Sequence, residues 1–137
     1  MRVFVDTNVW LAGRFGRGLC AELLETLVEQ DIEILLDERV LAEFRRIGRD
    51  KFAVDERTLD EADLFFKRYA TVLSASATPT VNVPDPDDAF IIAAALSADA
   101  SLFVTGGKAL LALESLGRMQ IVDPRRMFMR LRGLASL

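Results

Sequence analysis

The sequence contains no histidine and a single cysteine, Cys20. Without histidine, the protein cannot use a serine or cysteine nucleophile activated by an imidazole, nor a zinc site built on histidine. A single cysteine cannot form an internal disulfide or a Cys-x-x-Cys site. Any chemistry must therefore depend on carboxylates, hydroxyl groups, lysine, arginine and bound metal.

The sequence also lacks an excess of positive charge and a long hydrophobic run. Seventeen Lys and Arg against 21 Asp and Glu give a net charge of −4, which argues against a surface coated with basic residues but still allows a local basic patch. The longest apolar run, residues 89–96, is far shorter than the roughly 20 residues that span a membrane. Asp6 interrupts the apolar N-terminus before the core of a signal peptide could form. We expect a cytoplasmic protein without membrane contact.

Strand and helix signals alternate along the chain, which at 137 residues and 51% hydrophobic content is expected to form one domain over residues 1–137. Short apolar runs predict strands at residues 3–5, 32–36, 101–104 and 119–122, with a further extended segment at 80–83 inside a surface loop at 74–83. Apolar residues at helical spacing predict helices directly after Asp6, at 18–31, 38–49, 55–71, 85–98 and 108–116, and from 123 onward.

This alternation predicts an α/β fold. Short, nearly continuous apolar strands separated by helices are typical of a central parallel sheet, here of four or five strands, with helices on both faces. In such sheets, reactive groups gather at the carboxyl ends of the strands, where the following helices begin.

Several carboxylates are expected at that edge. Asp6 follows the first strand, Glu43 lies on the helix after the second, and the group at residues 85–88 starts the Ala-rich helix. Converging carboxylates repel each other unless a cation neutralises them or they take up protons. Mg²⁺ and Mn²⁺ prefer oxygen ligands, and two such ions about 4 Å apart can activate water and stabilise the leaving oxygen of a phosphodiester. The same residues also allow a purely structural interpretation, because aspartate before a helix, with proline at its first position, makes a good helix start.

Four segments in this order resemble the PIN-domain family, and in particular small prokaryotic PIN proteins of toxin–antitoxin pairs. These segments are VFVDTNV at residues 3–9, LAEF at 41–44, DPDDAF at 85–90 and VTG at 104–106. The resemblance spans nearly the whole chain. It implies a three-layer α/β fold with a central parallel sheet, and a cytoplasmic nuclease that cleaves RNA with Mg²⁺ or Mn²⁺.

The resemblance also implies roles for individual residues. Asp6, Glu43 and Asp88 match three acidic residues of the family that bind metal and carry catalysis, and Asp85 is a neighbouring metal ligand. Further residues would support this site, namely Thr7, Asn8 and Thr105.

The sequence departs from the family pattern at Gly107. After the fourth strand the family usually has a fourth acidic residue, and Gly107 stands in its place. Three acidic residues would hold one metal ion, but a second ion would lack a ligand. The alternative function is therefore a PIN-fold protein, weakened or inactive as an enzyme, that binds RNA or a partner chain.

Basic residues near the acidic group are candidates for binding RNA phosphates, although each also fits a solvated surface. They are Arg45, Arg46, Arg49 and Lys108. The resemblance further implies a homodimer, with the helix at 55–71 and the first helix as candidate surfaces, and a cognate antitoxin protein. A phosphoacceptor receiver domain is a third, weaker alternative, since it needs a pair of acidic residues after the first strand where Asp6 stands alone.

Overall fold

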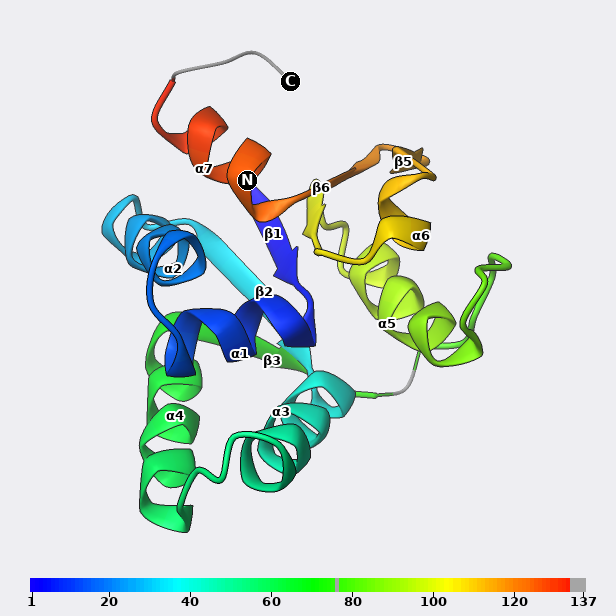
Figure 1. The fold of residues 1–137 in the computed structure, drawn as a ribbon. Helices are drawn as coiled ribbons and strands as arrows, with labels where there is room; N and C mark the ends of the chain where they lie inside the picture. The colour runs from blue at the N-terminus through cyan, green and yellow to red at the C-terminus, as the bar shows by residue number, and fades with distance from the viewer. Residues whose placement is uncertain (76, 134–137) are drawn as a thin grey trace.

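The computed structural model describes residues 1–75 and 77–133, and its centre is a six-stranded sheet of order β3-β2-β1-β4-β6-β5 (Figure 1). The strands are β1 (Arg2–Val5), β2 (Glu33–Asp37), β3 (Ala70–Leu73), β4 (Leu102–Val104), β5 (Ser115–Leu116) and β6 (Met119–Val122). All neighbouring strands pair in parallel except β5 and β6, which are antiparallel. The predicted α/β class with a mostly parallel central sheet is confirmed.

Helices cover both faces of this sheet. They are α1 (Thr7–Phe15), α2 (Leu19–Glu29), α3 (Glu38–Asp50), α4 (Glu56–Tyr69), α5 (Pro86–Ser97), α6 (Lys108–Leu111) and α7 (Pro124–Leu131). In Figure 1, α1 to α4 gather on one side of the sheet, and α5 and α6 lie on the other. No described helix is both long enough and apolar enough to cross a membrane.

Aspartates start five of these helices. In each case one carboxylate oxygen accepts a hydrogen bond of 2.8–3.0 Å from a backbone N–H of the first turn. The five residues are Asp6, Asp37, Asp55, Asp85 and Asp123. Capping satisfies N–H groups that have no partner inside the helix. It therefore explains the local positions of Asp6 and Asp85, whether or not they have a further role.

Three predicted segments differ from the structure. The helix expected at 55–71 ends at Tyr69 and the chain continues as β3, whereas residues 80–83 form no strand and residue 76 of the same loop lies outside the described residues. The helix expected at 108–116 ends at Leu111, because Glu114 adopts a left-handed φ of 62° and the chain turns into the β5–β6 hairpin.

Aromatic side chains fill the space between α1, α3 and α4. Trp10 is fully buried, and its ring meets that of Phe66 edge-on at 4.8 Å between centroids. Phe44 lies 5.0 Å from Phe66 on one side and 5.0 Å from Phe15 on the other. These contacts fix α3 against α1, and thus fix the helix that carries Glu43 relative to the end of β1 that carries Asp6.

Candidate functional site

Asp6 is fixed by hydrogen bonds from two elements at the carboxyl edge of the sheet. Oδ1 accepts a bond of 2.8 Å from the backbone N–H of Thr7, and Oδ2 accepts one of 2.8 Å from the hydroxyl of Thr105, which follows β4. The backbone N–H of Asp6 donates to the carbonyl of Val104 at 3.0 Å. Burial raises the pKa of Asp6, the two hydrogen bonds oppose that shift, and the charge of Glu43 adds to it.

Asp88 lies close enough to the other acidic residues for their charges to interact. Its pKa is raised to about 6, first by burial and then by the negative charges of Asp6, Asp85, Glu43 and Asp87. Asp88 and Glu43 are partly buried, whereas Asp85 and Asp87 are exposed. The end of β1, the middle of α3 and the start of α5 therefore bring four sequence-predicted carboxylates, those of Asp6, Glu43, Asp85 and Asp88, into one electrostatic cluster, which we call the acidic site.

The chemistry of the acidic site fits a hard divalent cation. All its ligating atoms are carboxylate oxygens, and their mutual repulsion is the kind of energy that Mg²⁺ or Mn²⁺ relieves. Over residues 1–75 and 77–133, however, no three acidic or other ligating side chains are gathered tightly enough to form a ready-made metal cluster. The side chains would thus have to close in on a bound ion.

The three expected supporting residues occupy different environments. Thr105 is fully buried and its hydroxyl both donates to Asp6 and accepts a 3.0 Å bond from the backbone N–H of Gly107. Thr7 is also buried, but it supports Asp6 through its backbone N–H, since its hydroxyl has no partner in the described structure. Asn8 is exposed, on the first turn of α1. Direct side-chain support for Asp6 therefore comes from Thr105.

Gly107 lies at the N-cap of α6 in an extended conformation, with φ −73° and ψ 118°. A Cβ atom added there would meet only the hydroxyl of Thr105, at 3.4 Å. Neither the backbone nor the surroundings require glycine at this position. A carboxylate would fit where the family usually has its fourth acidic residue.

Two of the four expected RNA-binding residues are occupied by other contacts. Arg45 pairs with Asp63, Asp60 and Glu56 of α4, and Arg49 pairs with Glu56. Each of these arginines lies among carboxylates of the protein and is poorly placed for phosphate. The remaining two, Arg46 on α3 and Lys108 at the start of α6, are exposed and form no ion pair within the described part of the chain.

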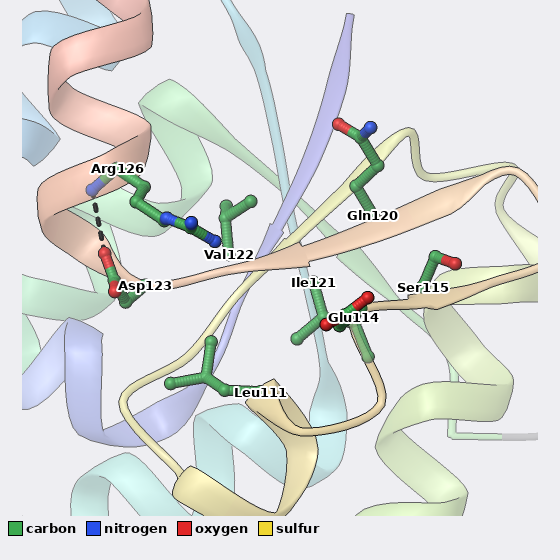
Figure 2. Close-up of a pocket in the computed structure, with 8 residues that line it drawn as sticks. All are labelled: Leu111, Glu114, Ser115, Gln120, Ile121, Val122, Asp123 and Arg126. Atoms are coloured by element: carbon green, nitrogen blue, oxygen red, sulfur yellow. Dashed lines mark hydrogen bonds between the residues drawn. The ribbon is translucent and has the colours of Figure 1, made fainter. Parts of the chain in front are cut away.

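A separate hollow of about 430 Å³ lies between α6, the β5–β6 hairpin and the start of α7 (Figure 2). Apolar side chains of Leu111, Ile121 and Val122 form part of its wall. Figure 2 shows Arg126 reaching from α7 toward this hollow and Glu114 facing it. None of the acidic-site residues lines it, so a ligand here would not touch the proposed catalytic groups.

Comparison with known proteins identifies the family of this chain. The family model described as PIN domain matches residues 2–109, so this protein is a member of the PIN-domain family. Its fold is shared with a chain in the crystal structure of VapBC2 from Rickettsia felis bound to a DNA fragment from their promoter. That match has a TM-score of 0.66 and 18% sequence identity, and covers 90% of this chain and 98% of the other. No curated protein matches the chain. Family membership removes the receiver-domain alternative.

Proposed function

We propose that this PIN domain is a metal-dependent ribonuclease. The observation that supports the proposal is the acidic site, in which the charges of Asp6, Asp85 and Glu43 all raise the pKa of the Asp88 carboxyl group. Such repulsion is unfavourable for folding, and carboxylates with strongly shifted pKa values are common at functional sites. The toxin-like sequence segments and the fold of the family favour RNA as the substrate.

Each side chain of the acidic site has a distinct role in this proposal. Asp6, Glu43 and Asp88 would hold Mg²⁺ or Mn²⁺, with Asp85 as a neighbouring ligand. When bound, such an ion lowers the pKa of water and neutralises charge on a phosphodiester. Thr7 and Thr105 hold the Asp6 carboxylate in one orientation through their hydrogen bonds. Burial of Asp6 limits the water that competes with it for a ligand.

Cleavage of a labelled single-stranded RNA by the purified protein tests the proposal. We expect cleavage with Mn²⁺ or Mg²⁺ and none with a chelator. Asp6→Asn and Asp88→Asn should each lower the rate at least about a hundredfold, because each removes a charged ligand. Asp99→Asn is the matched control, since Asp99 is exposed at the opposite edge of the sheet and its φ of 54° suits asparagine. Equal cleavage by the Asp6 and Asp99 variants would refute the proposal.

Gly107 favours a second candidate function, in which the fold binds RNA or a partner chain without cutting. Without a fourth carboxylate, a second metal ion would lack a ligand. The same assay separates the two functions. Binding of RNA without metal-dependent cleavage, at enzyme concentrations in excess of the RNA, would support the second candidate.

We further propose that the protein is the toxin of a toxin–antitoxin pair and forms a homodimer. The solved structure with the same fold carries the name VapBC2 and holds a promoter DNA fragment. Leu64 and Tyr69 of α4 are large and exposed, which suits an interface on this helix. Arg126 in the hollow of Figure 2 offers a contact for an acidic segment of an antitoxin.

Light scattering at micromolar concentration tests the dimer. The wild-type protein should have twice the monomer mass, and Leu64→Glu should reduce it to the monomer because it places a charge in the apolar contact. A wild-type monomer would contradict the dimer but leave the nuclease proposal untouched.

A further inference from the structure

Arg39, which no sequence pattern singled out, lies one helical turn before Glu43 on α3. Residues four positions apart in a helix project from the same face, so Arg39 and Glu43 share one side of α3. Arg39 is exposed and forms no ion pair with any described residue. It differs in this respect from Arg45 and Arg49, whose charges are already neutralised by α4.

The guanidinium of Arg39 lies over the ring of Phe90 on α5. Its central carbon is 4.3 Å from the ring centroid of Phe90, and Nη2 makes a long bond of 3.4 Å to the carbonyl of Ala75. Its charge also lowers the pKa of buried Asp37, although burial raises that pKa more strongly. Arg39 thus spans from α3 to α5, the two helices that carry Glu43 and Asp88.

Stacking on an aromatic ring uses the face of a guanidinium and leaves N–H groups at its edge free to donate. Phe90 therefore restrains the guanidinium of Arg39 without consuming all its hydrogen-bonding capacity. A planar cation in a fixed orientation matches the oxygens of a phosphate diester. The acidic site alone would repel an RNA strand, so a cation beside it supplies attraction that the carboxylates lack.

We propose that Arg39, positioned by Phe90, binds a phosphate of the RNA strand adjacent to the acidic site. This inference rests on the proposed ribonuclease function and deepens it by naming a substrate-binding residue. Arg39 touches the substrate backbone, whereas Phe90 is a positioning residue that acts through Arg39. Binding through phosphate predicts an effect on affinity that is independent of RNA sequence.

The test measures binding of a fluorescent single-stranded RNA by anisotropy in the presence of Mg²⁺. All variants carry Asp6→Asn, so that the RNA is not cleaved during the measurement. Arg39→Gln should weaken binding about tenfold, the usual effect of losing a charge-assisted hydrogen bond. The slope of log K against log salt should fall in magnitude by about 0.7, the value of one phosphate contact on a single strand. Arg39→Lys should retain most of the affinity, and Phe90→Leu should give an intermediate loss.

Arg57→Gln is the matched control, because Arg57 is an exposed arginine on α4 whose side chain is 91% accessible and whose removal changes net charge equally. It should change affinity less than twofold. Equal salt slopes for Arg39→Gln and Arg57→Gln would overturn the inference while leaving the ribonuclease proposal intact. Failure of both the wild-type protein and the Asp6→Asn variant to bind RNA at all would overturn both proposals.

A second measurement avoids dependence on the folding of the Arg39 variant. The Asp6→Asn protein, with Arg39 itself unchanged, is treated with an arginine-selective dicarbonyl reagent with and without RNA, and modified residues are located by mass spectrometry. RNA should protect Arg39 and leave Arg57 as reactive as before. Equal reactivity of Arg39 in both samples would overturn the inference.

Discussion

The hydroxyl of Thr105 donates a hydrogen bond of 2.8 Å to Oδ2 of Asp6, joining the ends of β4 and β1 at the carboxyl edge of the sheet. The hydroxyl oxygen of Thr105 also accepts a hydrogen bond of 3.0 Å from the backbone N–H of Gly107. One buried side chain thus fixes both the first carboxylate of the acidic site and the turn that follows β4.

Thr105→Val should destabilise the protein by about 1–3 kcal/mol, because it removes the hydrogen-bond partner of Oδ2 of the partly buried Asp6 and that of the Gly107 N–H. It should also raise the pKa of Asp6 further, since the hydroxyl bond opposes the shift caused by burial. Urea unfolding measures the stability. Thr105→Ser keeps the hydroxyl and should lose less stability than Thr105→Val. A larger loss of stability for serine than for valine would show that packing of the threonine methyl group dominates.

Asp88→Asn should stabilise the protein at pH 7. The folded-state pKa of Asp88 is raised to about 6 from its ordinary value of 3.8. The ionised carboxylate therefore destabilises the fold above pH 6, and this penalty disappears as the pH falls toward 4. Because the side chain is only partly buried, solvent screening limits the gain to about 1 kcal/mol.

Urea unfolding at pH 7 and pH 4 tests this pH dependence, with Asp99→Asn as control because Asp99 is exposed and its charge does not act on the pKa of Asp88. The stability gain of Asp88→Asn should shrink at the lower pH, while the control should show little gain at either pH. A pH-independent gain would show that charge repulsion at Asp88 is not its cause.

Mn²⁺ should raise the melting temperature, because the proposed metal site exists in the folded protein and not in the unfolded chain. Mass action gives about 2.7 kcal/mol at a hundredfold excess over the dissociation constant. Calorimetry should show this shift in the wild type and in Asp99→Asn, and no shift in Asp6→Asn. An undiminished shift in Asp6→Asn would remove Asp6 from the ligand set.

Gly107→Asp should increase both Mn²⁺ affinity and RNA cleavage, the latter about tenfold or more, by adding the family's fourth carboxylate. The φ of −73° means that the substitution carries no left-handed strain, and aspartate suits the N-cap of α6. Gly107→Asn is the control, since it has nearly the same shape without the charge. If both variants cleave at the wild-type rate, the missing carboxylate does not limit activity.

The sequence predicts the layered fold well because its strongest strands are short apolar runs followed directly by capping aspartates. It misses β3, because the helical spacing of Leu59, Ala62, Phe66 and Tyr69 runs straight into Ala70–Leu73 without a break. What makes that segment a strand is its pairing with β2, a contact between distant parts of the chain. Local patterns do not contain this information.

The convergence of the acidic residues follows from the rule that parallel strands end at one edge. The ion-pair partners of the arginines do not follow from any such rule. Arg45 and Arg49 follow Glu43 closely in sequence, yet α4 supplies carboxylates that face them. The contact between Arg39 and Phe90 depends on how α3 and α5 approach each other. Spacing from Glu43 could have indicated the shared face, but not the aromatic partner.

Because β5 is short and antiparallel, the two edges of the sheet differ in how readily they can pair with a further strand. Its two residues cover the flank of β6 and offer almost no backbone length of their own for another chain. The opposite flank ends in β3, which pairs only with β2 among the described strands. If two copies paired β3 with β3 around a two-fold axis, the edge strand of each copy that can accept another strand would already be paired. Strand addition in this protein would therefore stop at a pair and could not propagate into a fibre.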